Sequence, residues 1–199
     1  MEISESFKEK VEKIKEKAKK YGASKDLMKL LDVQKDVILP HWPHIKCSFG
    51  CKNYGESLCC PPYIPEPDEW REFLKDYKYA LIIGFKGIMN VIFKNQEKLN
   101  KNIFRLERKA FLMGFHKAFI FFPGYCMLCK KCIVKEDDFP KGMDPKLARR
   151  LCKHLDKARP SMEATGIDVF GTIRNAGLEL KVVSSENDKV VWYTMLLLE

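Results

Sequence analysis

The sequence has no apolar run long enough to cross a bilayer. Its most continuous apolar stretch, residues 79–85, is far shorter than the roughly 20 residues that a membrane-spanning helix needs. The opening residues, MEISESFKEK, contain no basic segment that leads into an apolar run, as a secretory signal would. We therefore expect a cytoplasmic protein without a membrane partner.

Sequence motifs for nucleotide cofactors are also missing. No G-x-G-x-x-G pattern and no P-loop pattern occurs, so nothing in the sequence supports a dinucleotide, flavin or nucleoside triphosphate. A nucleophile-base pair cannot be recognised without a fold. The sequence thus leaves it open whether the protein is an enzyme.

The formal net charge of +9 is not accompanied by a basic patch interleaved with aromatic residues. Lys and Glu alternate over residues 8–20, as they do on an ordinary solvated helix. Two tetrathiolate iron-sulfur clusters would also lower the net charge by about four. We therefore do not expect nucleic-acid binding to be the main function.

What the chain does have is cysteine. The 199 residues, of which 46% are apolar, can bury a core without disulfides. In a reducing cytosol, eight closely spaced cysteines are more typical of metal ligands than of disulfides.

Cys126, Cys129 and Cys132 form a C-x2-C-x2-C run. Two-residue gaps allow three thiolates to converge on one inorganic core, as in [4Fe-4S] ferredoxins. The fourth ligand must come from elsewhere in the chain. We expect it to be Cys152, with Cys60 as the competing candidate because Cys60-Pro61 resembles the end of a ferredoxin run.

A second group contains Cys47, Cys51, Cys59 and Cys60. It is not a radical-SAM motif, which would need a cysteine where Tyr54 stands. We expect Cys47, Cys51 and Cys60 to form a second metal site, with Cys59 either included or present as a packed thiol.

Zinc is the main rival to iron and sulfur at both sites. It takes four thiolates tetrahedrally, and C-x2-C is its commonest spacing. At the second site His41 or His44 could supply a fourth zinc ligand. The third cysteine at a second two-residue step favours a [4Fe-4S] cluster at the first site, so we expect one or two clusters, with zinc as the alternative.

The middle of the chain predicts an α/β fold. Residues 79–85 are typical of a strand covered on both faces, residues 95–114 carry an apolar helical stripe, and residues 118–122 form the returning strand. Such a β-α-β crossover is expected to be parallel, and to deliver Cys126 at the carboxyl end of a strand, where ligand sites are favoured.

The flanking segments complete a small mixed sheet. We predict N-terminal helices over residues 3–21 and 24–31, followed by irregular structure at residues 40–44. Further expectations are a helix from Asp144 that carries Cys152 in its last turns, a helix over residues 168–175, and a C-terminal hairpin of residues 178–183 and 189–198. We predict one metal-binding domain, residues 1–199, with residues 1–40 as a helical appendage.

Several motifs together resemble a known but uncharacterised family of predicted metal-binding proteins. They are Cys60-Pro61-Pro62, the C-x2-C-x2-C run, and residues 158–169, which read ARPSMEATGIDV. The resemblance spans about residues 40–180. It implies metal binding and assigns no reaction.

Arg159 and Ser161 lie within that last motif. Both suit capping and packing, but a helix N-terminus beside an Arg is also a ready anion site. We therefore keep them as a candidate substrate or anion site. The favoured function is an iron-sulfur protein that transfers electrons to a redox partner protein or reduces a small-molecule substrate; the alternative is a zinc-binding structural or interaction protein without catalysis.

Overall fold

The computed structural model describes residues 3–140 and 142–199. Its strands and helices, in chain order, are α1 (Glu5–Lys20), a 3-10 turn (Lys25–Leu27), β1 (Met28–Asp32), α2 (Val33–Asp36), α3 (Trp42–Gly50), α4 (Pro67–Lys75), β2 (Tyr79–Ile88), α5 (Met89–Lys94), α6 (Gln96–Leu112), β3 (Phe119–Ile120), a 3-10 turn (Ile133–Lys135), α7 (Pro145–Arg149), a 3-10 turn (Glu163–Thr165), α8 (Val169–Asn175) and β4 (Lys189–Leu197). The predicted α/β class is confirmed.

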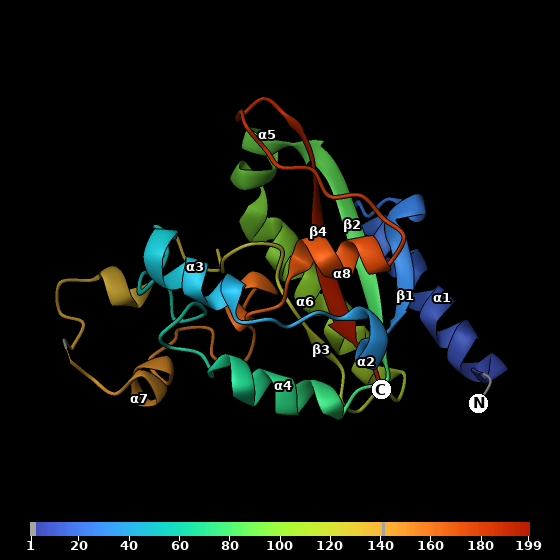
Figure 1. Cartoon of the computed structure of the whole chain (residues 1–199), viewed down its shortest axis with the longest axis horizontal. Helices are drawn as coiled ribbons and strands as arrows, with labels where there is room; N and C mark the ends of the chain where they lie inside the picture. Colours follow the sequence, from blue (N-terminus) through green and yellow to red (C-terminus); the bar gives the residue numbers. More distant parts are fainter. Residues whose placement is uncertain (1–2, 141) are drawn as a thin grey trace.

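One four-stranded sheet, in the order β1-β2-β4-β3, organises the molecule (Figure 1). Each neighbouring pair is antiparallel. β2 and β4 form the longest ladder, from Ala80 opposite Leu197 to Ile88 opposite Lys189. Because this pair is central, its side chains contribute to both faces of the sheet.

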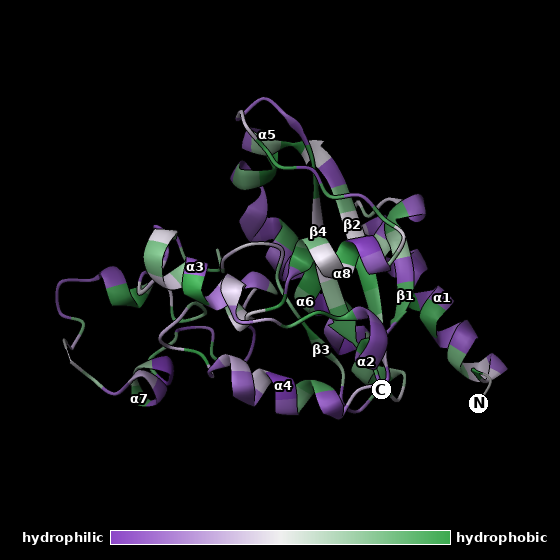
Figure 2. Ribbon diagram, in the orientation of Figure 1, coloured by the Kyte–Doolittle hydropathy of each residue, from purple (hydrophilic) through white to green (hydrophobic). Residues whose placement is uncertain are grey.

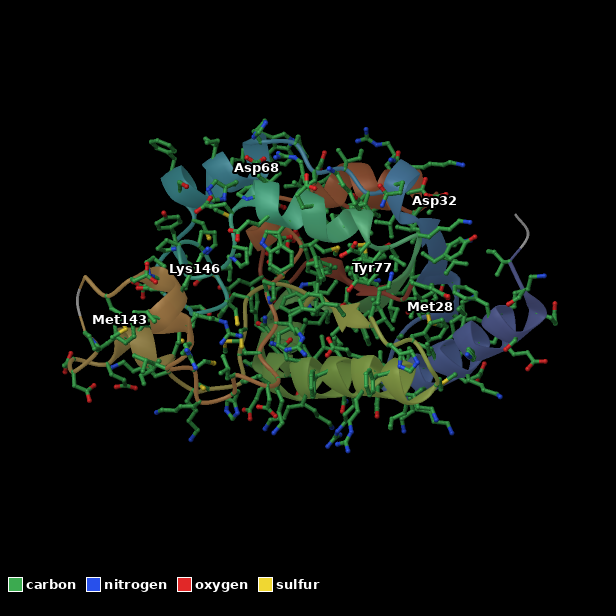
Figure 3. The ribbon with its side chains drawn as sticks, turned by 90° about the horizontal axis from the view of Figure 1, so that it is seen from below. Met28, Asp32, Asp68, Tyr77, Met143 and Lys146 are labelled. Atoms are coloured by element: carbon green, nitrogen blue, oxygen red, sulfur yellow. The ribbon has the colours of Figure 1, made fainter. Side chains whose placement is uncertain are left out.

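The two faces of the sheet support two separate hydrophobic cores. Leu81 and Ile83 pack with α1 and α6 on one face, whereas Ala80 and Ile82 pack with α4 and α8 on the other. Figure 3 shows these helix pairs on opposite sides of the sheet, and Figure 2 shows hydrophobic colouring concentrated on the strands between them. The continuous apolar run of β2 is therefore explained, as predicted, by burial on both faces.

The amphipathic N-terminal helix is confirmed. The Ser4 hydroxyl caps α1 by accepting a hydrogen bond from Phe7 N at 3.2 Å, and Gly22 follows the helix with a φ of +95°. The buried residues of α1 recur at helical spacing and pack against α6; they are Phe7, Val11, Ile14 and Ala18.

The expected β-α-β crossover contains an inserted strand. β2, α6 and β3 follow one another as predicted, but β4 lies between β2 and β3 and is antiparallel to both. β2 and β3 therefore run in the same direction without pairing, and the sheet has no parallel neighbours. The cause is the apolar C-terminal strand: residues 193–197 are fully buried, which favours a central position.

The predicted C-terminal hairpin is wrong. Residues 189–197 form β4, but residues 178–183 form no strand. β4 already pairs with β2 along its whole length, and the 178–183 segment passes beside it with Val182 82% exposed. Residues 180–183 of this segment line a cavity instead of pairing with a neighbouring strand.

Two local predictions are also corrected. Residues 28–31 of the expected second helix, 24–31, belong to strand β1, because Met28 and Leu31 are buried in the cores on the two faces of the sheet. Irregular structure was expected at residues 40–44, but α3 begins at Trp42. Pro43 stands in the first turn of α3, where proline is compatible with a helix.

Within residues 3–140 and 142–199, no helix combines the length and apolar character that crossing a membrane would require.

Candidate metal centre

The cysteines lie in two long loop regions at one end of the sheet. We call residues 42–65, 123–140 and 142–158, which include α3 and α7, the cysteine lobe. It projects to the left of the sheet in Figure 1, and the labels Met143 and Lys146 mark its outer part in Figure 3. Contacts from one loop region to the other include an ion pair between Lys135 Nζ and Glu56 Oε2 at 2.9 Å.

The chain reaches Cys126 through a tightly held segment. Phe121 N donates to Met195 O at 2.9 Å, and Phe122 N donates to Pro160 O at 2.8 Å. The buried Gln96 side chain then donates to Tyr125 O at 2.7 Å. Gly124 has a φ of +73°, which favours glycine. The start of the C-x2-C-x2-C run is therefore fixed to α6 and to the sheet.

One cavity of about 200 Å³ gathers the four cysteines expected at the first site. Cys126, Cys129, Cys132 and Cys152 all line it. Cys152 comes from a turn after α7, which ends at Arg149, and not from the last turns of a helix as predicted. A single water takes up about 30 Å³ of liquid, so the cavity has more room than a single ion needs.

Cys59 lines this same cavity. Cys126 packs against the same cluster as Cys59; this neighbouring thiol, with burial, raises the pKa of Cys59 well above its usual value. Cys59 in turn lowers the pKa of Cys126. The structure therefore places Cys59 with the first group of cysteines, although it is adjacent in sequence to Cys60.

A half-buried cation, Arg149, lies beside these thiols. Arg149 Nη2 donates to Ala158 O at 3.2 Å, while Arg149 Nη1 is buried and has no hydrogen-bond partner within the described part of the chain. The charge of Arg149 helps to lower the pKa of both Cys126 and Cys152, although burial keeps that of Cys152 above its usual value. A buried guanidinium nitrogen without a partner is costly, so the residues present fit a negatively charged tetrathiolate centre.

Cys47, Cys51 and Cys60, the remaining three cysteines, lie close enough to affect one another's pKa. Burial and the neighbouring Cys51 raise the pKa of Cys47 to about 11. Burial, followed by Cys51 and Cys47, raises the pKa of Cys60 to about 12. Cys47 Sγ lies 4.0 Å from Glu163 O. The structure therefore brings Cys47, Cys51 and Cys60 into one neighbourhood.

The two candidate histidines of the second site differ in their surroundings. His41 Nδ1 lies 3.4 Å from Arg71 Nη2. His44 Nε2 lies 3.4 Å from Glu66 Oε2, and its buried Nδ1 has no partner within the described residues. Of the two, His44 is the one that retains a buried ring nitrogen for a ligand.

No three His, Cys, Asp or Glu side chains of residues 3–140 and 142–199 are already arranged to hold a metal ion. The first group of thiols shares a cavity and the second group lies close together. In both groups the sulfur atoms would have to move closer to one another to bind a metal. Metal ligation requires thiolates, and the raised pKa values of Cys47 and Cys60 oppose that deprotonation.

Arg159 and Ser161 are both engaged within the fold. Arg159 forms two ion-pair contacts with Glu107, at 2.9 and 2.6 Å, and its guanidinium lies over the rings of Phe104 and Phe119. The Ser161 hydroxyl accepts from Ala164 N at 3.2 Å and is buried. These contacts favour a capping and packing role over an anion site.

The sequence of the chain also matches a known protein family. Residues 29–198 match the model of a family described as "Predicted metal-binding protein (DUF2284)". The chain belongs to this family. The family description supports metal binding in general and names no metal. No curated protein and no solved structure matches the chain significantly.

Sequence reasoning missed Arg149 and the role of Gln96. Arg149 stands three residues before Cys152, a spacing that could have placed the two side by side. Gln96 sits among the charged residues that begin α6, and only the tertiary structure shows that it is buried and holds the loop leading to Cys126. No sequence signal distinguishes it from an exposed helical glutamine.

Proposed function

We propose that this member of the family is an iron-sulfur protein. In this proposal Cys126, Cys129, Cys132 and Cys152 hold a [4Fe-4S] cluster. The observation that carries it is the cavity shared by these four thiols, together with the two-residue spacing of the first three. Such a cluster supplies one-electron chemistry when it is bound.

The surroundings of the cavity suit an anionic centre. Arg149 supplies a half-buried positive charge, and the adjoining core excludes water, since Phe122 is fully buried and Leu128 nearly so. Both features stabilise a cluster and tune its potential, because charge, hydrogen bonds to sulfur and exposure set that potential.

The rim of the cavity suggests how a partner would approach. Lys130, Lys131 and Lys135 all line it, together with Glu56, which pairs with Lys135. A basic rim attracts an acidic redox protein or an anionic small molecule and increases the rate of encounter. We therefore propose electron exchange with one of these two kinds of partner. Cys47, Cys51 and Cys60 form a second metal site in this proposal.

A structural zinc site is the second candidate. The observation that favours it is the scarcity of regular structure around the thiols: the described residues of this region, 121–140 and 142–158, contain only one short helix and one 3-10 turn. A tetrathiolate zinc would tie such loops together without taking part in a reaction.

Metal analysis of anaerobically purified protein separates the two candidates. We expect a brown protein that contains iron with matching acid-labile sulfide and has a broad visible absorption band. Cys129→Ala is the matched variant and should lose most of this absorption. Colourless protein with stoichiometric zinc, after expression with ample iron and sulfur, would overturn the iron-sulfur proposal.

A further inference from the structure

A second cavity, of about 400 Å³, lies beside the cysteine lobe. We call it the β4 pocket, because residues 190–193 of β4 line it together with residues 180–183. Consecutive strand residues point to opposite faces. Since all four consecutive β4 residues line the pocket, it lies at the edge of the strand.

That edge of β4 is open. β4 pairs with β2 over its full length, but β3 pairs only with Leu196 and Leu197. In Figure 1 the segment after α8 runs past the upper part of β4 towards α5. Residues 178–183, which were expected to form a hairpin strand, do not pair with β4, and a cavity lies between the two segments.

The pocket and the first thiol cavity share a wall. Asn53 and Tyr125 line both cavities, and Cys126 follows Tyr125 directly. The second cysteine group is also adjacent, because Glu163 lines the pocket and its carbonyl oxygen lies 4.0 Å from Cys47 Sγ. A molecule in the pocket would therefore lie one side chain away from the proposed cluster.

The lining of the pocket indicates the class of ligand. It is mainly apolar and rich in aromatic rings; Phe93 and Trp192 meet edge to face with their centroids 5.0 Å apart. Lys52 and Lys181 supply two positive charges, although Lys181 Nζ also lies 3.6 Å from the exposed Glu179 Oε1, and Glu163 supplies one carboxyl group. Its volume falls within the roughly 300–1,000 Å³ that is typical of small-molecule sites.

We propose that the β4 pocket binds a planar aromatic anion, with the ring against Trp192 and the anionic group near Lys181. Aromatic faces stack on planar rings, and an ammonium group pairs with a phosphate, sulfonate or carboxylate. The use of this ligand as an electron partner of the cluster rests on the proposed function; its binding does not.

Titration with fluorescent aromatic anions tests the site. The probes are flavin mononucleotide, riboflavin, which has the same ring without the phosphate, and anilinonaphthalene sulfonate. We expect saturable binding of flavin mononucleotide and the sulfonate, and about tenfold weaker binding of riboflavin. Wild-type protein that binds neither anionic probe saturably would overturn the proposal.

Variants locate the binding. Trp192→Ala should weaken binding of flavin mononucleotide by about tenfold, whereas Trp42→Ala, which removes an exposed ring on α3, should not. Val182→Glu keeps the test valid if the tryptophan variant misfolds. Val182 is 82% exposed, and a negative charge there should repel both anionic probes. Equal binding by Val182→Glu and wild type would place the probes elsewhere and overturn the proposal.

The titration uses the protein as purified, whichever metal it holds. If the purified protein contains zinc and still binds the anionic probes, the proposed electron-transfer function is wrong and the proposed pocket is supported. An iron-sulfur protein that binds neither anionic probe would remove the pocket and leave the cluster standing.

Discussion

Arg159, the residue that follows the cysteine lobe, forms a two-point ion pair with Glu107 of helix α6, with Nε to Oε2 at 2.9 Å and Nη2 to Oε1 at 2.6 Å. Glu107 Oε2 also accepts from Ile120 N at 2.8 Å. One carboxylate therefore ties α6 both to strand β3 and to the ARPSMEA segment. Arg159 therefore anchors the segment that follows Cys152 to helix α6.

The first prediction concerns this ion pair. Arg159→Met leaves a buried carboxylate without its cation and should lower the free energy of unfolding by about 3–5 kcal/mol. Changing both Arg159 and Glu107 to Met should restore part of that loss, because no buried charge then remains unpaired. Urea unfolding of the metal-loaded proteins measures the effect. Lys157→Met, on the lobe surface, is the control and should change stability by no more than about 1 kcal/mol.

The second prediction concerns how the metal is divided between sites. Cys129→Ala should remove the centre in the first cavity and leave metal on Cys47, Cys51 and Cys60. Cys51→Ala should do the opposite. Iron, zinc and sulfide counts on the two variants provide the measurement. Equal and complete metal loss from both variants would end the two-site hypothesis.

The third prediction concerns Cys59, the fifth thiol of the first cavity. Because Cys59 lines the cavity beside Cys126 and its pKa is raised well above its usual value, we expect it to stay a protonated thiol that donates a hydrogen bond to a cluster sulfur, and not to act as a ligand. Cys59→Ala should then keep its iron and show a lower midpoint potential, since hydrogen bonds to cluster sulfur raise that potential. Cys152→Ala is the comparison and should lose iron. Matching iron loss in the two variants would make Cys59 a ligand instead.

The fourth prediction concerns Arg149. Reduction adds negative charge to a centre that is already anionic, so removing the half-buried Arg149 cation should disfavour reduction. Arg149→Met should therefore lower the midpoint potential, and Arg149→Lys should lower it less. Arg150→Met, which changes an exposed neighbour, is the control. An unchanged potential in iron-loaded Arg149→Met would remove Arg149 from the surroundings of the cluster.

The fifth prediction concerns Tyr77 and alkaline pH. Its hydroxyl donates to Lys117 O at 2.7 Å, and burial raises its pKa to about 12. An unfolded tyrosine deprotonates near pH 10, so this stabilising contribution is complete below that pH and is lost as the pH rises towards about 12. Tyr77→Phe should show a smaller decline in unfolding free energy across this range. Tyrosinate absorbance of wild type and variant checks the assignment.

Some features of the fold follow from local sequence alone. The apolar spacing of α1 and α6 and the continuous apolar run of β2 predict their structures, because a helical stripe or a doubly buried strand needs only local pattern and one hydrophobic partner. The likeness to the family of predicted metal-binding proteins was also readable from the cysteine spacing and the ARPSMEA segment, and the family match confirms it.

Only the tertiary structure decided how these pieces meet. β4 lies between β2 and β3, although it is last in sequence, and no local pattern states which strands will be neighbours. Adjacent Cys59 and Cys60 divide between the two cysteine groups, because the turn through residues 57–60 directs neighbouring side chains differently. The sequence determines which side chains are available for chemistry, whereas long-range packing determines which of them share a cavity.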